Sequence, residues 1–241
     1  MSISIDGALV RRDGSPWSVK KFERHEVADY EKRRYRGLDQ RLVDGREKRI
    51  LRRLLGSLRK KAGRARPEES PVILDAPCGY GRFSALVGDR GFRIVSCDLS
   101  PNMVSRTLER LRPEPGRGVV ADLVRGLPFK AEAFDGILSM RLFHHLHREA
   151  DRRAVLSEFA RAARGGVVLS YYQMTALHIL QRRLRRLLGK GRYEIKMISR
   201  RQFDREAEES GFRVVRAVPL IRGIHAQRIA WLEKKGPASR I

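Results

Sequence analysis

The stretch VILDAPCGYGRF, residues 72–83, constrains the fold of this chain more than any other feature. Residues that favour a buried strand run into an aspartate, and a loop with Gly79 and Gly81 follows. Two such glycines let the backbone adopt positive φ angles and come close to a ligand. A helix is predicted directly after this loop, and its first backbone N–H groups would point toward the same ligand. The pattern predicts a ligand-binding turn, although a tight strand-to-helix turn without a ligand has the same signature.

Strands and helices alternate along the chain after this turn. Further strands are predicted at 93–98, 118–122, 134–140 and 165–172, and helices at 82–87, 100–112, 148–163 and 199–211. Two successive strands, 212–221 and 225–235, end the pattern. Strict alternation implies a parallel sheet with helices on both faces, and the last two strands imply an antiparallel hairpin at one edge. We therefore expect an α/β fold with a doubly wound sheet of seven strands, mostly parallel with an antiparallel edge strand.

The chain before residue 70 has a different character. A polar, helix-compatible stretch runs from His25 to Leu38, and a strongly amphipathic helix is predicted at 46–62. The apolar face of that helix contains Ile50, Leu51, Leu54, Leu55 and Leu58. The segment AGRARPEESP then reads as a linker. We divide the chain into a basic N-terminal helical extension, 1–69, and a ligand-binding domain, 70–241.

An insert at 173–198 interrupts the alternation. Its string LHILQRRLRRLLGKGR carries leucines on one helical face and arginines largely on the other. Such a helix can cover a substrate pocket, or it can lie on an anionic membrane surface. The lid is the more common use, and we expect it here.

The charge is strongly basic, with 52 Lys and Arg against 28 acidic residues and a net charge of +24. Residues 46–66 hold ten cations and one acid, and residues 176–193 hold six cations and no acid. Such a field favours nucleic acid, acidic lipid or a phosphorylated substrate, although a solvated basic surface explains it equally well. No apolar run approaches the ~18 residues of a membrane span. We expect a cytoplasmic protein, with peripheral contact at the inner membrane face as an option.

Two further acidic residues end predicted strands. Asp98 closes the second strand, where a carboxylate can accept both hydroxyls of a ribose. Asp122 ends the third strand before Leu123, a pair that suits an adenine amino group beside an apolar wall. Asp98 can also be a helix cap and Asp122 a turn residue. Their joint placement at carboxyl ends, where open parallel sheets bind ligands, favours a cofactor site.

With these residues the sequence resembles the class I S-adenosylmethionine-dependent methyltransferases of the small-molecule type. The matching stretches are VILDAPCGYGRF, IVSCDLSPNMV, VVADLVRGLPF and AFDGILSMRLFHHL, within about residues 70–235. The resemblance implies a Rossmann-like sheet, an enzyme and S-adenosylmethionine as cofactor. It also implies that the cofactor site contains Asp75, Pro77, Cys78, Gly79, Tyr80, Gly81, Asp98, Leu99, Met103, Asp122, Leu123 and Arg141.

The resemblance assigns roles to some of these positions. Asp75 would lie with the loop glycines against the methionine part of the cofactor, and Asp98 would hold the ribose. Arg141, just past the fourth strand, would face both donor and acceptor. Pro77 departs from the family, which commonly has glycine there. Proline lacks an N–H, so we expect Pro77 to be a rigid wall and residues 78–81 to supply ligand-contacting amides.

Candidates for acceptor chemistry follow the fourth strand. His144 and His145 in RLFHHLH are on the carboxyl side, where a base would be needed for an oxygen acceptor, although either can instead pack in the loop or cap a helix. Tyr171 and Tyr172 suit pocket walls and core positions equally. A thiol nucleophile at Cys78 is less favoured than a packing role. No cysteine cluster or helical histidine pair points to a metal site, so we expect no metal.

The sequence thus favours methyl transfer to a small-molecule acceptor, anionic or linked to a lipid or saccharide. One alternative is an RNA methyltransferase that uses the basic surfaces, although no RNA-binding module is recognisable. Another is a non-catalytic module that binds S-adenosylmethionine. A nicotinamide-dependent oxidoreductase fits poorly, because Gly79-x-Gly81-x-x-Ser84 is a weak dinucleotide fingerprint.

Overall fold

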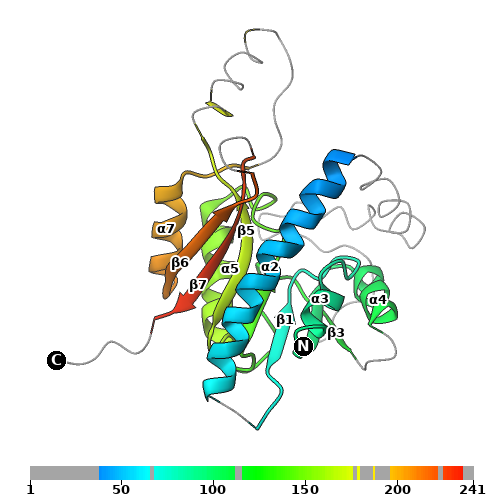
Figure 1. Cartoon of the computed structure of the whole chain (residues 1–241). Helices are drawn as coiled ribbons and strands as arrows, with labels where there is room; N and C mark the ends of the chain where they lie inside the picture. The colour runs from blue at the N-terminus through cyan, green and yellow to red at the C-terminus, as the bar shows by residue number, and fades with distance from the viewer. Residues whose placement is uncertain are drawn as a thin grey trace, which may run out of the picture.

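A seven-stranded sheet forms the centre of the computed structural model, which describes residues 38–65, 68–111, 116–175, 178–179, 187, 196–221 and 225–235. The strands lie in the order β3-β2-β1-β4-β5-β7-β6 (Figure 1). Their bounds are β1 (Val72–Asp75), β2 (Arg93–Asp98), β3 (Arg117–Val120), β4 (Gly136–Ser139), β5 (Gly166–Tyr172), β6 (Phe212–Pro219) and β7 (Gln227–Lys234). The predicted stretch from His25 and most of the insert lie outside the described residues.

The first five strands are parallel, and β7 is antiparallel to both of its neighbours, β5 and β6. This arrangement confirms the predicted α/β fold with a hairpin at one edge. Within the hairpin, the antiparallel strand β7 is the inner member and β6 forms the edge. The chain winds from β1 outward to β3 and then crosses to β4, so β1 and β4 flank the switch point at which such sheets bind ligands.

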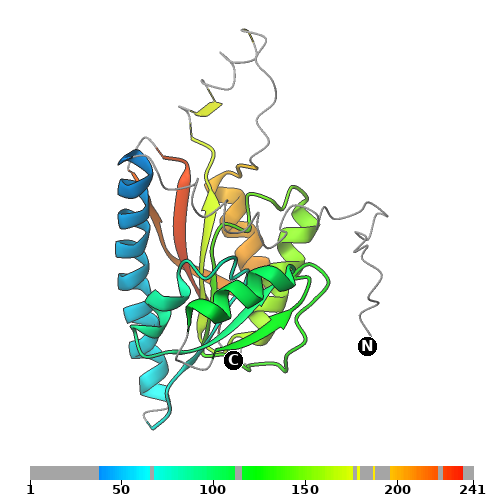
Figure 2. The same ribbon diagram turned by 90° about the vertical axis from the view of Figure 1, so that its right-hand side faces the viewer.

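The helices cover both faces of the sheet (Figures 1 and 2). They are α2 (Leu38–Ala65), α3 (Ser84–Gly88), α4 (Pro101–Arg110), α5 (Glu149–Ala162) and α7 (Arg200–Glu209). Figure 2 shows α2 along one face and α5 with α7 against the other. The two faces have separate apolar cores, and β1 contributes Ile73 to the α2 side and Leu74 to the α5 side, as the alternation of side chains along a strand requires.

Capping residues set the starts of α4 and α7. The Oγ of Ser100 accepts a hydrogen bond from the Met103 amide at 3.4 Å, and Pro101 occupies the first turn. The Oγ of Ser199 accepts one from the Gln202 amide at 3.1 Å. The first cap was predicted from the sequence and is confirmed.

The helix α2 is longer than predicted at both ends and continues into the expected linker. It ends at Ala65, two residues before Pro67, which disfavours helical geometry in the residue that precedes it. Its predicted apolar face is buried against the sheet and α3, with exposed fractions of 0–6% for Ile50, Leu51, Leu54, Leu55 and Leu58. The region before residue 70 therefore supplies part of the core on one face of the sheet, and the boundary that we drew at residue 70 stays a prediction.

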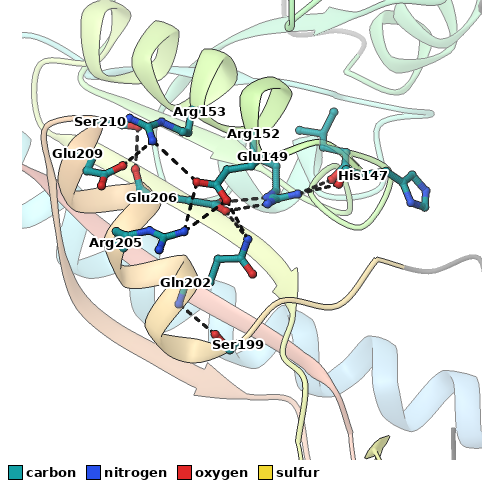
Figure 3. A network of polar contacts seen from close by, with 11 residues as sticks. His147, Glu149, Arg152, Arg153, Ser199, Gln202, Arg205, Glu206, Glu209 and Ser210 are labelled. Atoms are coloured by element: carbon teal, nitrogen blue, oxygen red, sulfur yellow. Dashed lines mark hydrogen bonds and ion pairs between the residues drawn. The ribbon is translucent and has the colours of Figure 1, made fainter.

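A buried ion pair joins α5 to α7 on the other face (Figure 3). The guanidinium of Arg152 donates to both carboxylate oxygens of Glu206 at 2.9 and 2.7 Å, and neither side chain is more than 1% exposed. Arg152 also donates to the backbone oxygens of Leu146 and His147, in the loop after β4. The pair therefore fixes the two helices and this loop together.

We predict that Arg152→Met lowers the free energy of unfolding by about 3–5 kcal/mol, because it leaves the Glu206 carboxylate buried without its guanidinium partner. Denaturant unfolding measures the change. The matched control on α7 is Arg200→Met, which breaks an exposed pair with Asp204 and should cost no more than about 1 kcal/mol. Adding Glu206→Leu to Arg152→Met should restore much of the loss, and no recovery in this double variant would contradict the ion-pair explanation.

Candidate functional site

Two carboxylates lie at the carboxyl ends of adjacent strands. Asp75 ends β1, is buried, and accepts a hydrogen bond from the Ser84 hydroxyl at 2.9 Å. Asp98 ends β2 and accepts two backbone bonds, from the Gly79 amide at 2.9 Å and the Ser100 amide at 3.0 Å. Asp98 therefore connects the glycine loop to the start of α4.

The glycine loop has the backbone geometry that the sequence predicts. Gly79 and Gly81 have φ angles of 55° and 77°, which residues with side chains rarely adopt. A Cβ atom at Gly81 would approach the Thr107 Cα to 3.1 Å, so a side chain there would push α4 away from the loop. The Thr107 hydroxyl also donates to the Gly79 carbonyl at 2.9 Å. The loop and α4 thus form one packed unit.

The loop amides are used differently from our expectation. Three of the four amides at 78–81 are hydrogen bonded within the protein: Cys78 to the Cys97 carbonyl, Gly79 to Asp98 and Gly81 to the Cys78 carbonyl. Pro77, half-buried after a cis peptide bond, has no amide to offer. These bonds fix the loop shape and orient Asp98, so the polar groups that the loop presents are chiefly carboxylates and carbonyls.

Burial makes both carboxylates reluctant to ionise. It raises the pKa of Asp75 to about 7, where the Ser84 hydrogen bond opposes the rise and the nearby Asp98 adds to it. Burial also raises the pKa of Asp98, against the stabilising bonds from the Ser100 and Gly79 amides. Two such groups side by side favour a cationic ligand, which would restore their ionised forms.

The two cysteines lie beside these carboxylates. Burial raises the pKa of the Cys97 thiol to about 12 and that of the Cys78 thiol further, and the neighbouring aspartates add to both shifts. Both thiols stay protonated at neutral pH, which supports the packing role over a nucleophilic one. Tyr80 is buried in the same loop, and the Arg110 guanidinium lies 5.2 Å from the centre of its ring.

The remaining residues predicted for the cofactor follow β2 and β3. Met103 is buried in α4 and Leu99 is half-buried. Asp122 accepts a bond from the Val124 amide at 2.9 Å, the turn role that the sequence left open, and Leu123 beside it is buried. The Ala121 amide donates to the Asp98 carbonyl at 3.0 Å, so this turn lies next to the end of β2.

A junction around Glu47 of α2 lies over the ends of β1 and β4. Its carboxylate is fully buried and contacts the guanidinium groups of Arg82 and Arg141, the latter at 2.9 Å. Gln227, at the start of β7, donates to it at 2.6 Å. Arg82 also pairs with Asp44 at 2.6 Å. Sequence reasoning missed Glu47, for which the only signal was its place as the single acid among ten cations in residues 46–66.

Arg141 has an unusual backbone. Its φ angle is 62°, in the left-handed region, and its amide donates to the Ser170 hydroxyl at 2.7 Å. Residues other than glycine and asparagine rarely adopt φ and ψ angles in that region. Residues with such strained backbone angles cluster at functional sites. The turn aims the Arg141 guanidinium at Glu47, as the hydrogen bonds record.

A histidine and tyrosine cluster lies past the ends of β4 and β5. The ring of buried His144 is 3.9 Å from that of exposed His145 and 5.0 Å from that of Tyr172, measured between centroids. His225, which sequence reasoning missed, lies 6.3 Å from Tyr172. Tyr171 points the other way and stacks on Phe203 at 3.9 Å in the core. The structure therefore places Tyr171 in the core and Tyr172 beside the histidines, and the pocket-wall role of Tyr172 stays a prediction.

His225 stays neutral near pH 7. Burial lowers its pKa, and Arg141 and His178 add to that shift while Glu47 opposes it. Its Nδ1 accepts a hydrogen bond from the Gln227 amide at 3.0 Å, so the ring proton is on Nε2. His225 can therefore donate a hydrogen bond to a ligand.

The two ends of the insert at 173–198 lie next to this histidine and tyrosine cluster. Gln173 and Ile198 form an isolated bridge, and the Ile198 amide donates to the Tyr172 carbonyl at 3.0 Å. The Lys196 amide donates to the His144 carbonyl at 3.1 Å. Most of the residues between these ends lie outside the described part of the chain, so the predicted lid stays a prediction.

Other site types find little support in the described ranges. They contain no group of three or more side chains that could hold a metal ion. They also contain no helix that is long and apolar enough to cross a membrane.

Part of this chain is similar in sequence to known methyltransferases. Residues 74–170 match the family described as a methyltransferase domain. A tRNA (carboxymethyluridine(34)-5-O)-methyltransferase of Xenopus tropicalis is 33% identical over 101 residues, 42% of this chain and 15% of that protein. A demethylmenaquinone methyltransferase of Beutenbergia cavernae is 36% identical over 102 residues, 42% of this chain and 39% of that protein.

Among solved structures, the magnesium protoporphyrin IX methyltransferase of Synechocystis with bound SAH has a TM-score of 0.68 at 16% identity, over 86% of this chain and 94% of that one. This likeness shows the fold. The structural likeness confirms the predicted fold, and the match of residues 74–170 supports the predicted S-adenosylmethionine-dependent methyltransferase class and its cofactor. The chain spans less than half the length of the two curated relatives named above, so their acceptors are not transferred to it.

We predict that Asp98→Asn weakens S-adenosylmethionine binding at least tenfold, about 1.4 kcal/mol, because an amide cannot accept from both loop amides and also hold a ligand. Calorimetric titration measures the affinity. Asp89→Asn, on the exposed turn after α3, is the control and should bind normally. Unchanged binding by Asp98→Asn would remove this residue from the cofactor site.

Asp75 should make stability depend on pH. Its folded pKa, about 7, exceeds the ordinary value of 3.8, so folding favours the protonated form. The resulting stabilisation is complete below pH ~4 and is lost as pH rises to ~7, by at most about 4 kcal/mol. Unfolding of the wild type and Asp75→Asn across this range measures it. A constant difference between the two proteins would show that Asp75 titrates normally.

Proposed function

We propose that this chain, whose residues 74–170 match a methyltransferase domain, uses S-adenosylmethionine to transfer a methyl group to an anionic small-molecule acceptor bound over the ends of β4 and β5. The observation that supports it most is the cluster of His144, Tyr172 and His225 next to the Glu47 junction. This cluster lies on the same edge of the sheet as the carboxylates that suit the cofactor.

The residues at the ends of β1 and β2 fit the cofactor. S-adenosylmethionine would supply a methyl group already activated on a sulfonium and would bring an ammonium group. Buried Asp75 and half-buried Asp98, both with raised pKa values, favour such a cationic ligand. The Gly79 and Ser100 amides donate to different oxygens of Asp98, and a carboxylate has about four acceptor sites, so it can also accept a ribose hydroxyl.

The Glu47 junction supports an anionic acceptor. Arg82, Arg141 and Lys48 bring three positive charges to Asp44 and Glu47, which bring two negative charges. The excess is positive and lies beside His225. An acceptor carboxylate or phosphate would be favoured there over a cation. The burial of Glu47 holds both guanidinium groups in place before any ligand arrives.

The chemistry needs positioning more than activation. Aligning a nucleophile for in-line displacement can lower a barrier by up to about 7–11 kcal/mol. An oxygen acceptor also needs a base, and buried His144 is better placed for it than exposed His145 because its ring faces Tyr172. His225 would orient the acceptor through its Nε2 proton. Arg141 would sit between donor and acceptor.

RNA is the second candidate acceptor. A relative named as a tRNA methyltransferase matches 42% of the chain, and the net charge of +24 would favour a polyanion. Labelled S-adenosylmethionine distinguishes the two. Label that enters low-mass or lipid fractions of a cell extract supports the proposal, and label that enters only nuclease-sensitive material supports RNA.

We predict that replacing residues 177–192 by a short glycine–serine linker spares S-adenosylmethionine binding and abolishes transfer. The replacement is feasible because the ends of the insert are paired at Gln173 and Ile198. Calorimetry measures the binding, and incorporation of label measures the transfer. A linker variant that turns over as fast as the wild type would show that the insert does not form the acceptor site.

A further inference from the structure

Four cations converge on the outer side of α2, away from the site described above. Arg52, Arg53 and Lys60 of α2 and Arg90 of the turn after α3 line an open depression of about 320 Å³, together with Gly56 and Ser57. In the described part of the chain, none of the four has an acidic partner within salt-bridge distance, whereas Lys48 and Lys61 on the same helix do. Such a concentration of like charge opposes folding unless an anion offsets it.

The turn that carries Arg90 is fixed to α2. The Arg59 guanidinium donates to the Gly91 carbonyl and lies 5.7 Å from the centre of the Phe92 ring. Gly91 has a φ angle of 70°, and a Cβ atom there would come within 3.0 Å of Arg59. Contacts of Arg59 with Gly91 and Phe92, the two residues after Arg90, therefore hold this wall of the depression in place.

Gly56 forms the floor. A glycine inside a helix lowers its stability relative to alanine, so its presence in α2 needs a reason. Packing does not supply one, because a Cβ atom at Gly56 would meet only the Arg90 Nη1, at 3.9 Å. The missing side chain instead leaves room between Arg90 and the cations of α2.

We propose that this pocket binds a ligand with two linked phosphate groups, a pyrophosphate or bisphosphate ester. Guanidinium groups match phosphate oxygens through paired hydrogen bonds, and three of the four cations are arginines. Two phosphoryl groups carry about three to four negative charges near pH 7, close to the charge of the four cations. A single phosphate would leave the pocket with a positive excess.

The pocket is separate from the proposed methyl-transfer site. Gly56 lies nine residues after Glu47 in α2, about 13 Å along the helix axis. Arg90 precedes β2 at its amino end, whereas Asp98 ends the same strand. The ligand is therefore a second one, and the inference goes beyond the proposed function.

A small ligand fits better than a macromolecular surface. Membrane-bound helices insert apolar side chains, but the apolar face of α2 is buried in the core, and the pocket is lined by four cationic residues with Ser57 and Gly56. A nucleic acid strand presents separated single charges to a basic surface, whereas these cations converge on one hollow.

Calorimetric titration with sodium pyrophosphate at constant ionic strength tests the proposal. The wild type should bind it in a saturable manner at one site. Arg53→Glu should weaken binding at least about tenfold through lost charge-assisted bonds. Gly56→Met keeps every charge but fills the floor, and it should weaken binding to a similar degree. Arg201→Glu, an exposed arginine of α7 on the opposite face of the sheet, is the matched control and should bind as the wild type does.

Several outcomes would overturn the proposal. Equal weakening by Arg53→Glu and Arg201→Glu would indicate diffuse charge, and normal binding by Gly56→Met would place the ligand elsewhere. Parallel titrations with an RNA oligonucleotide and with phosphatidylserine vesicles cover the other occupants. If the wild type does not bind pyrophosphate but binds the RNA or the vesicles, and Arg53→Glu weakens that binding, the pocket binds a macromolecule or a membrane and the proposal is wrong. Thermal unfolding midpoints verify that each variant is folded.

Discussion

The buried carboxylate of Glu47 ties α2 to three other parts of the fold: the loop after β1 through Arg82, the turn after β4 through Arg141, and β7 through Gln227. A carboxylate buried without such partners would cost several kcal/mol. The helix therefore cannot dock without bringing both arginines to the switch point. Its other half carries the basic pocket, so one helix contributes to both the proposed acceptor side and the proposed second anion site.

Electrostatics divide the edge of the sheet into two parts. Over β1 and β2, buried Asp75 and half-buried Asp98 form an acidic site, and their raised pKa values favour a cationic ligand. Over β4 and β5, the three cations Arg82, Arg141 and Lys48 outnumber the two carboxylates they contact, and a neutral His225 offers a proton donor. A cationic methyl donor and an anionic acceptor would meet where these two parts adjoin. In a phosphate-binding turn the loop amides would donate to the ligand. Here the amides of Cys78, Gly79 and Gly81 donate to protein oxygens and fix the loop beside Asp98.

Much of the fold and of the acidic part of the candidate site could be predicted, because the sequence patterns that indicate them involve residues close together in the chain. Asp98 was expected at the end of β2, Ser100 at the start of α4 and a hairpin at the sheet edge, and the structure has all three. Glu47 and His225 could not be predicted. Each acts on residues far away in the chain, and neither belongs to a recognisable motif.

The sequence by itself determined the alternation of strands and helices, the glycine turn and the order of the acidic strand ends, because each depends on periodicity or on the φ preferences of a few neighbouring residues. Only the tertiary structure decided that the basic helix is part of the core, that Tyr171 packs inward while Tyr172 joins the histidines, and that Gly56 opens a pocket beside Arg90. These features depend on which strands become neighbours and on the partners that a buried charge requires, and both are settled only when distant segments pack together.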